Sequence, residues 1–191
     1  VVILGSGETG HTAKAAAEEL GAAEIAVVSR TGELNYENLA ERYGDRAFYL
    51  INTTPVGMAP ESGVSPLELR AFPHCKGVAD VIYNPLRTRL CQQAAALGIP
   101  ACSGLLMLAA QAAAAEYAFG TAAPGEDAVL RVYRELLAER RNLVFIGMPG
   151  SGKTTIGRLA AQMLEREFID CDEEYLLEYG ITPQGELLAH G

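Results

Sequence analysis

The segment of residues 147–154, GMPGSGKT, constrains the fold of this chain more than any other feature. It follows the apolar run NLVFI at residues 142–146, which we expect to form a strand, and apolar residues at helical spacing come after it. Small residues let backbone N–H groups converge on phosphate oxygens, and a following helix adds positive potential at its N-terminus. The pattern therefore predicts a strand, a phosphate-binding loop and a helix in that order.

The spacing within this loop gives separate tasks to the lysine and to the hydroxyl after it. Lys153 is predicted to reach the β- and γ-phosphates of ATP as the catalytic cation, and Thr154 to ligate Mg²⁺. The expected nucleotide-binding residues are Gly150, Ser151, Gly152, Lys153, Thr154 and Thr155. A further predicted strand, residues 167–169, leads into Asp170 and Asp172, where α/β proteins bind ligands.

A second glycine loop, GSGETG at residues 5–10, lies between a predicted strand and a predicted helix. Its G-x-G-x-x-G spacing is the fingerprint of dinucleotide binding. We expect the cofactor to contact Gly5, Ser6, Gly7, Glu8 and Thr9. Ser29, Arg30 and Thr31 end the next strand, where NAD enzymes usually carry an acid, so NADP is favoured; an ordinary exposed arginine is the alternative.

Strands and helices alternate over residues 1–140, which predicts a Rossmann-type parallel sheet with helices on both faces, followed by a partial P-loop α/β unit. The predicted strands are residues 1–4, 24–29, 47–51, 77–82 and 99–102. The predicted helices are residues 11–20, 35–43, 87–97, 105–119 and 127–140, with a turn at 120–126. We expect two domains, residues 1–140 and 142–191, with the boundary near Arg141.

Composition limits the binding partners and the compartment that we expect for this chain. The formal net charge of −9 argues against a nucleic-acid partner, and no apolar run is long enough to cross a membrane. Four scattered cysteines without a C-x-x-C pair favour the reducing cytoplasm. The chain starts on an apolar strand without methionine and ends after a glycine-rich turn, so we expect both ends to be cut from a longer protein. The oligomeric state stays open.

Four motifs occur in order along residues 1–140: SRT at 29–31, NTTPVGM at 52–58, DVIYNPLRT at 80–88 and GLLMLAAQA at 104–112. Together they resemble shikimate dehydrogenase. The resemblance implies that Thr53, Pro55, Gly57 and Met58 lie beside the cofactor, and that Gly104 and Met107 border the nicotinamide. It also implies that Tyr83 and Gln111 face the substrate. Taken singly, Tyr83 and Met107 are also typical of a core, and Gln111 of a solvated helix.

The chain departs from the dehydrogenase pattern in two ways. Ser29 replaces the asparagine of the family's N-R-T-x-x-[KR] segment and Leu34 supplies no second cation, so NADP affinity or selectivity is expected to be weaker. The family's catalytic lysine and aspartate precede the first strand of this chain, and neither Lys14 nor Lys76 sits in that motif.

The glycine loop of residues 147–154 continues into GRLA at residues 157–160 and FIDCDEE at 168–174, and this order resembles the start of shikimate kinase. The resemblance implies that Asp170 supports the metal and that Asp172 accepts hydrogen bonds from shikimate hydroxyls. The chain ends before the family's substrate-binding arginine and its arginine-bearing lid. A kinase segment this short is expected to leave its apolar helix exposed.

Both resemblances point to one bifunctional enzyme of the shikimate pathway. It would reduce 3-dehydroshikimate with NADPH and phosphorylate shikimate with ATP and Mg²⁺, so its partners would be small-molecule substrates. Two alternatives stay open: a catalytically incomplete nucleotide-binding module, and a dehydrogenase that acts on quinate.

Overall fold

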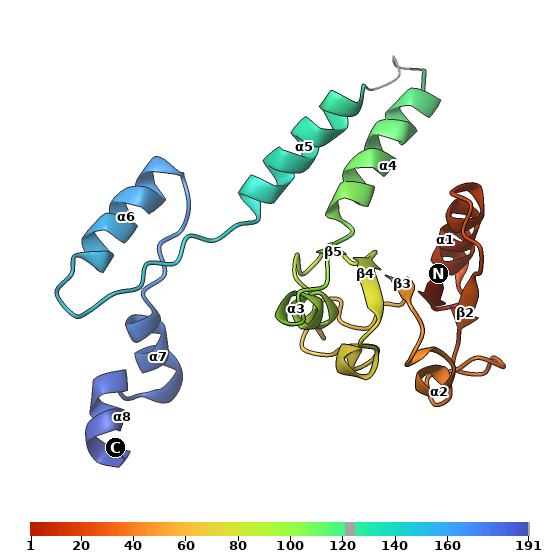
Figure 1. Cartoon of the computed structure of the whole chain (residues 1–191). Helices are drawn as coiled ribbons and strands as arrows, with labels where there is room; N and C mark the ends of the chain where they lie inside the picture. The colour runs from red at the N-terminus through yellow and green to blue at the C-terminus, as the bar shows by residue number, and fades with distance from the viewer. Residues whose placement is uncertain (121–124, 191) are drawn as a thin grey trace. The chain divides into compact units, whose positions relative to one another are not determined.

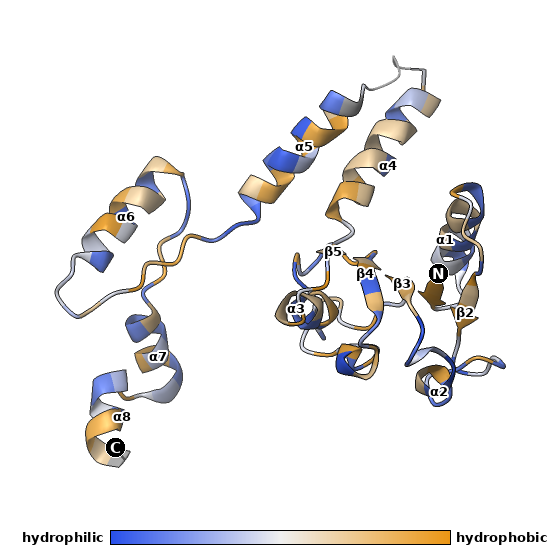
Figure 2. Cartoon of the chain, in the orientation of Figure 1, coloured by the Kyte–Doolittle hydropathy of each residue, from blue (hydrophilic) through white to orange (hydrophobic). Residues whose placement is uncertain are grey.

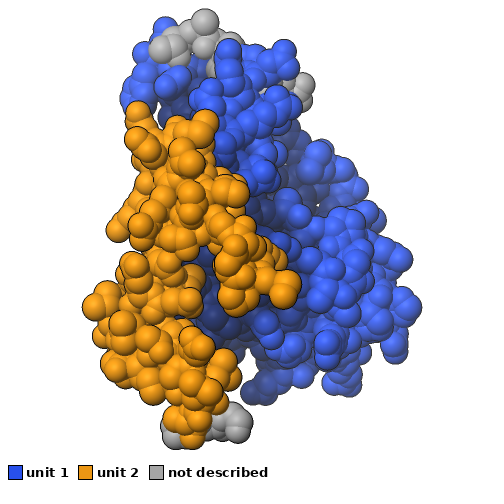
Figure 3. Space-filling model, turned by 90° about the vertical axis from the view of Figure 1, so that its left-hand side faces the viewer, with its two compact units in different colours: residues 1–141 blue, residues 142–191 orange. Residues whose placement is uncertain are grey.

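The computed structural model describes residues 1–120 and 125–190, which fall into two compact units (Figure 3). Unit 1 is Val1–Arg141 and unit 2 is Asn142–Gly191. Residues 121–124 of the predicted turn at 120–126 lie outside the described residues, as does Gly191.

Unit 1 is built on a sheet of five parallel strands in the order β2-β1-β3-β4-β5 (Figure 1). The strands are β1 (Val2–Leu4), β2 (Ala26–Val28), β3 (Phe48–Asn52), β4 (Cys75–Asp80) and β5 (Ala101–Cys102). In the register, Leu4 pairs with Val28 and Asn52, and Asn52 also pairs with Asp80. The predicted parallel α/β sheet is therefore confirmed.

Helices join these strands. They are α1 (Glu8–Glu19), α2 (Leu39–Tyr43), α3 (Arg89–Ala96), α4 (Leu105–Ala118) and α5 (Glu126–Glu139), with a short 3₁₀ helix at Leu69–Ala71. Helix α1 packs on β1, α3 packs on β4 and β5, and α4 packs against α5. Because the chain leaves β1 toward β2 on one side and later runs toward β3, β4 and β5 on the other, right-handed crossovers place α1 and α3 on opposite faces.

A hydrophobic cluster of unit 1 lies on one face of this sheet. Val2, Leu4 and Leu50 alternate with residues of the other face and are buried together with Leu39 and Leu90 from helices α2 and α3. The ring of Phe48 meets Tyr43 and Phe72 edge to face, each at a centroid distance of 5.8 Å. Apolar burial in this cluster stabilises the unit.

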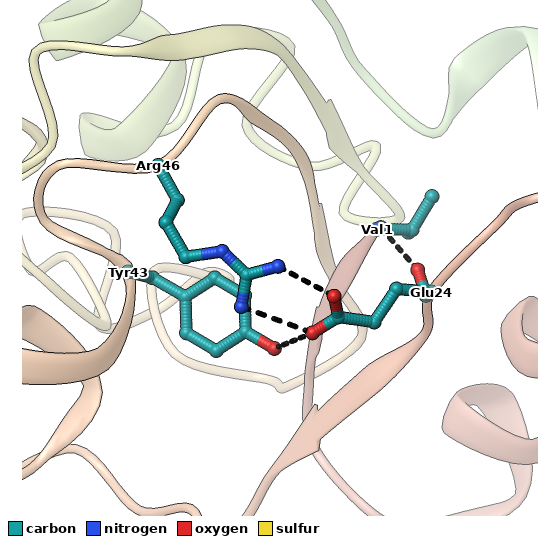
Figure 4. Close-up of polar contacts among 4 residues, drawn as sticks. All are labelled: Val1, Glu24, Tyr43 and Arg46. Carbon is teal, nitrogen blue, oxygen red and sulfur yellow. Dashed lines mark hydrogen bonds and ion pairs between the residues drawn. The ribbon is translucent and has the colours of Figure 1, made fainter.

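A polar network ties the start of β2 to the end of α2 (Figure 4). Arg46 donates to both carboxylate oxygens of Glu24 at 3.1 and 2.5 Å, and the Tyr43 hydroxyl donates at 2.7 Å. These hydrogen bonds, that of Arg46 first, lower the pKa of Glu24 to about 2. The network is at the surface, so salt screens it.

The helix predicted at residues 35–43 begins only at Leu39, which corrects the prediction. The side chain of Asn35 accepts hydrogen bonds from the backbone N–H groups of Glu37 and Asn38, at 3.0 and 3.2 Å. Asn38 accepts from the N–H of Asn35 at 2.9 Å. Such side-chain bonds compete with helical ones, so these residues form a turn.

Helix α4 is apolar around much of its circumference (Figure 2). It buries Leu105 and Ala109, while Leu106, Met107 and Tyr117 are exposed. At 14 residues it is short. In the part of the chain that the structure describes, no helix is both long and apolar enough to cross a membrane.

Unit 2 contains α6 (Lys153–Met163), α7 (Cys171–Tyr179) and α8 (Pro183–His190). The strands predicted at residues 142–146 and 167–169 are wrong, because residues 142–190, all of which are described, form no strand. A strand needs a neighbour to satisfy its N–H and C=O groups, and neither segment finds one in this unit. Ile146 is consequently 89% exposed.

Candidate functional site

The two predicted cofactor loops of unit 1 meet at the switch point of the sheet. The connection after β1 runs to β2 on one side, and the connection after its neighbour β3 runs to β4 on the other, so a crevice opens between the carboxyl ends of β1 and β3. Gly5 follows β1 and Thr53 follows β3. Thr53 donates to the Leu4 carbonyl oxygen through its backbone N–H at 2.9 Å and through its hydroxyl at 2.6 Å.

The glycines of the loop at residues 5–10 have different structural roles. A Cβ atom at Gly10 would lie 2.4 Å from the Gly5 carbonyl oxygen, so only glycine lets α1 pack this closely. Gly5 has φ +104°, which side chains disfavour. Gly7 faces open space and precedes α1 without a side-chain cap, so N–H groups remain free for a pyrophosphate.

The other predicted residues of this loop, Ser6, Glu8 and Thr9, are exposed. The Glu8 carboxylate stands in the first turn of α1, where it would repel a phosphate. Glu8 therefore suits a pyrophosphate only through its backbone N–H. The loop fits a dinucleotide by its backbone and not by its side chains.

Residues 29–31 follow β2, beside the first loop: the Gly5 N–H donates to the Val28 carbonyl oxygen at 2.8 Å. Arg30 and Thr31 are on the surface side of this turn, while the Ser29 hydroxyl packs against Gly32, where a Cβ would lie 2.5 Å away. Leu34 is only 8% exposed and belongs to the core. Arg30 is thus the cation available for a 2′-phosphate in this turn.

The loop after β3 is held by Asn52, the last residue of that strand. Asn52 Oδ1 accepts from the backbone N–H of Thr54 at 3.1 Å and from its hydroxyl at 2.7 Å. Gly57 has φ +96°, and a Cβ there would lie 2.9 Å from the Val64 carbonyl oxygen. Pro55 and Met58 are exposed between these fixed points, as a cofactor contact requires.

Sequence reasoning missed the polar cluster beneath both loops, which consists of Asn52, Asp80 and Thr88. Asp80 is 2% exposed and accepts from Asn52 Nδ2 at 3.0 Å, from the Thr88 hydroxyl at 2.7 Å and from the Ile82 N–H at 3.1 Å. Burial raises the pKa of Asp80, and these hydrogen bonds partly oppose the rise. Since Asn52 and Asp80 end neighbouring strands, their positions in the motifs were the available signal.

Tyr83 lies in the loop after β4 and is 39% exposed. Helix α4 begins against the same loop: Gly104 donates to the Ile82 carbonyl oxygen at 3.0 Å, and a Cβ at Gly104 would lie 1.9 Å from the Val81 carbonyl oxygen. Gly104, Met107 and Gln111 share one face of α4 because of their i, i+3, i+7 spacing. Met107 and Gln111 are exposed on it.

Unit 2 presents a pocket of about 310 Å³, lined by Gly150, Ser151, Gly152, Lys153, Thr154 and Thr155. Gly150 and Gly152 have φ +75° and +84°, so glycine is required at both turns. Lys153 Nζ donates to the carbonyl oxygens of Gly147 and Met148 at 2.8 and 2.9 Å. A phosphate entering this pocket would replace these neutral acceptors with charged ones.

The two predicted site carboxylates of unit 2, Asp170 and Asp172, lie at the start of α7. Asp170 caps the helix by accepting from the Asp172 N–H at 3.1 Å, and Asp172 is exposed in the first turn. Among the described residues no group of three or more His, Cys, Asp or Glu side chains is placed to hold a metal. Mg²⁺ commonly takes one or two protein ligands with phosphate and water, so Thr154 and Asp170 stay predicted ligands.

The two units thus define two classes of site. Unit 1 is a dinucleotide-binding α/β domain with its glycine loop at a switch point, and unit 2 carries a P-loop. The shikimate kinase family model matches residues 149–189. Shikimate kinase from Bacillus pumilus (strain SAFR-032) is 47% identical over 53 residues, which are 28% of this chain and 29% of that protein.

Unit 1 resembles dehydrogenases in sequence and in structure. Shikimate dehydrogenase (NADP(+)) from Geobacter sp. (strain M21) is 33% identical over 164 residues, 74% of this chain and 56% of that protein. A chorismate mutase/shikimate 5-dehydrogenase fusion protein from Clostridium acetobutylicum superposes with a TM-score of 0.68 at 30% identity, covering 74% of this chain and 55% of that one. The chain spans about half the length of the curated dehydrogenases it matches. It therefore joins a region homologous to shikimate dehydrogenases to a region that matches the shikimate kinase family.

Proposed function

We propose that the chain supplies the NADP-binding half of a shikimate dehydrogenase and the ATP-binding part of a shikimate kinase. The proposed reactions are the reduction of 3-dehydroshikimate to shikimate with NADPH and the phosphorylation of shikimate with ATP and Mg²⁺. The observation that carries the proposal is the meeting of the Gly5 and Thr53 loops at the switch point, beside Arg30.

In the dehydrogenase half, the free N–H groups at the start of α1 bind the pyrophosphate, and Arg30 binds the 2′-phosphate. When bound, the cofactor supplies the hydride. Gly104 and Met107 border the nicotinamide, and Tyr83 and Gln111 orient the substrate. The buried Asp80 cluster holds the loops after β3 and β4 in place, so that cofactor and substrate residues keep one geometry.

In the kinase part, Lys153 exchanges the carbonyl oxygens of its own loop for the β- and γ-phosphates. Thr154 and Asp170 hold Mg²⁺, and Asp172 accepts hydrogen bonds from the hydroxyls of shikimate. The lysine then stabilises the charge that develops during phosphoryl transfer.

A titration of the whole chain with NADPH and with Mg·ATP tests both halves. We expect saturable binding of each, and Lys153→Ala should weaken ATP binding while NADPH binding is unchanged. Lys76→Ala is the control, because Lys76 lies at the amino end of β4, away from the switch point. Absence of NADPH binding would refute the first half, and ATP binding that is unaffected by Lys153→Ala would refute the second.

A nucleotide-binding module without turnover is the second candidate, and the placement of the lysines favours it. Of the two lysines in unit 1, Lys14 pairs with Glu18 in the middle of α1 and Lys76 is at the amino end of β4. Neither lies at the carboxyl edge, where a proton must reach the reduced carbonyl. Steady NADPH oxidation with 3-dehydroshikimate would exclude the module, and parallel assays with quinate and NADP⁺ identify the preferred substrate.

We further propose that the protein acts in the cytoplasm on small-molecule substrates. Cys75, Cys91, Cys102 and Cys171 are all unpaired, which suits a reducing compartment. Localisation of a tagged chain by fractionation tests this.

A further inference from the structure

Asp80 is a buried carboxylate at the carboxyl end of β4, and no cation balances it. It is 2% exposed, and among the residues that the structure describes it forms no ion pair with a lysine, arginine or histidine. Its Oδ1 accepts hydrogen bonds from Asn52 Nδ2 and the Ile82 N–H, and its Oδ2 accepts from the Thr88 hydroxyl. Because Asp80 is the acceptor in all three, these bonds stabilise its charged form. The carboxyl edge of the sheet therefore contains a fixed negative charge.

This charge is linked to both segments that are predicted to contact the nicotinamide end of the cofactor. The Ile82 N–H donates to Asp80 at 3.1 Å, and the Ile82 carbonyl oxygen accepts from the Gly104 N–H at 3.0 Å. On the side of β3, Asn52 donates to Asp80 at 3.0 Å and leads into the loop predicted to lie beside the cofactor. One residue thus connects Asp80 to Gly104, and one connects it to that loop.

The oxidised and reduced cofactors differ by one charge on the nicotinamide ring. The ring of NADP⁺ is a cation and that of NADPH is neutral, whereas the phosphates are the same in both. A buried carboxylate attracts a nearby cation more strongly than a surface carboxylate does, because the interior has a lower effective dielectric constant and salt does not screen it. The charge of Asp80 therefore distinguishes the two forms, whereas a purely structural role would not.

We propose that the buried charge of Asp80 makes the cofactor site bind NADP⁺ more tightly than NADPH. The inference rests on the proposed dehydrogenase function and gives Asp80 a role beyond holding the loops in place. Tighter binding of the oxidised form makes bound NADPH a stronger hydride donor, so the charge favours reduction of the carbonyl substrate. Asn52 and Thr88 support this role by donating to the carboxylate.

Calorimetric titration of the whole chain with NADP⁺ and with NADPH tests the proposal through the ratio of the two dissociation constants. The wild-type chain should bind NADP⁺ more tightly. Asp80→Asn keeps the size of the side chain and removes its charge, so it should weaken NADP⁺ binding about three- to tenfold relative to NADPH binding. Asp80→Ser is a second neutral variant and should shift the ratio in the same direction. A thermal melt shows whether each variant is folded.

Two controls separate the charge from the structure. Leu90→Ala removes a fully buried side chain of α3, so it should lower stability and leave the ratio unchanged. Asp45→Asn removes an exposed carboxylate that precedes β3, at the amino end of the sheet, and should also leave the ratio unchanged. A shift of the ratio in either control as large as that in Asp80→Asn would contradict the proposal.

Equal weakening of NADP⁺ and NADPH by the Asp80 variants would overturn the proposal, because it would indicate a structural role alone. An unchanged ratio would overturn it as well. If neither Asp80 variant folds, the wild-type ratio decides, and NADPH binding that equals or exceeds NADP⁺ binding would refute the inference. In these cases the proposed dehydrogenase function stands, whereas a wild-type chain that binds neither form would refute that function too.

Discussion

Each unit contains a glycine loop that matches a phosphate-binding motif, but the burial of the residues that support the loop differs between the two units. In unit 1 the loop is anchored to a five-stranded sheet whose core residues are buried, such as Leu50 at 1% exposure. In unit 2 the P-loop has its pocket, but Leu159 on the following helix is 55% exposed. A phosphate loop depends on a few local backbone angles, whereas a core depends on strands that pair across the chain.

The largest expected effect separates the two units by their cores. Leu50→Ala should lower the free energy of unfolding of unit 1 by about 2–5 kcal/mol, because it opens a cavity among buried residues. Leu159→Ala in unit 2 should change stability by less than about 0.5 kcal/mol, as exposed sites do. Urea unfolding followed by circular dichroism measures both. Similar losses for the two variants would mean that unit 2 has a packed core.

The glycine loop of unit 1 offers a matched pair. Gly10→Ala should destabilise unit 1 by about 1–3 kcal/mol, because its Cβ would meet the Gly5 carbonyl oxygen. Gly7→Ala faces open space and should preserve stability while it weakens NADPH binding. Thermal melts and NADPH titrations distinguish the two. The loop geometry is contradicted if Gly10→Ala melts like the wild type.

The buried cluster under the cofactor loops should also be measurable. Thr88→Val removes the hydrogen bond to Asp80 and the cap of α3, where Thr88 Oγ1 accepts from the Cys91 N–H at 3.2 Å. We expect a loss of about 1–3 kcal/mol in the free energy of unfolding, since Asp80 stays buried with one partner fewer. Thr88→Ser keeps the hydroxyl and should retain most of the stability. Equal losses for both variants would indicate methyl packing in place of hydrogen bonding.

The smallest expected effect is the pH dependence from Glu24. Its pKa falls from 4.5 to about 2 on folding. Its contribution to the free energy of unfolding is therefore complete above pH 4.5 and is lost as the pH drops toward 2. Glu24→Gln should flatten this part of the stability curve, and the effect should shrink in high salt because the pair is exposed. Glu61→Gln, an exposed loop residue, is the control. An unchanged acid slope in Glu24→Gln would exclude the network as its source.

The sequence predicted the sheet of unit 1 because short apolar runs such as residues 1–4 and 47–51 alternate with longer helical patterns, which is typical of a parallel α/β sheet. It misplaced the start of α2, since the side-chain bonds of Asn35 and Asn38 do not appear in apolar periodicity. The strands predicted in unit 2 failed because pairing is not local. For the same reason, the hydrogen bond from Gly104 to Ile82 could not be read from spacing.

For the candidate sites, motif spacing identified the six residues that line the P-loop pocket. It did not show that Lys153 donates hydrogen bonds to backbone carbonyl oxygens of its own loop, because a motif specifies side chains and not backbone acceptors. Asn52 and Asp80 were quoted within motifs, yet their role needs the register that sets the ends of β3 and β4 side by side.

The central claim is that unit 1 is an NADP-selective dinucleotide site that depends on Arg30. Its most direct test is the ratio of the NADH and NADPH dissociation constants, measured by titration of the whole chain. We expect NADPH to bind about tenfold or more tightly than NADH, because Arg30 forms charge-assisted hydrogen bonds with the 2′-phosphate. Arg30→Ala should abolish this preference, while Arg70→Ala, in the 3₁₀ helix before β4, should keep it. A wild-type ratio near one, or a preference that survives Arg30→Ala, would contradict the claim.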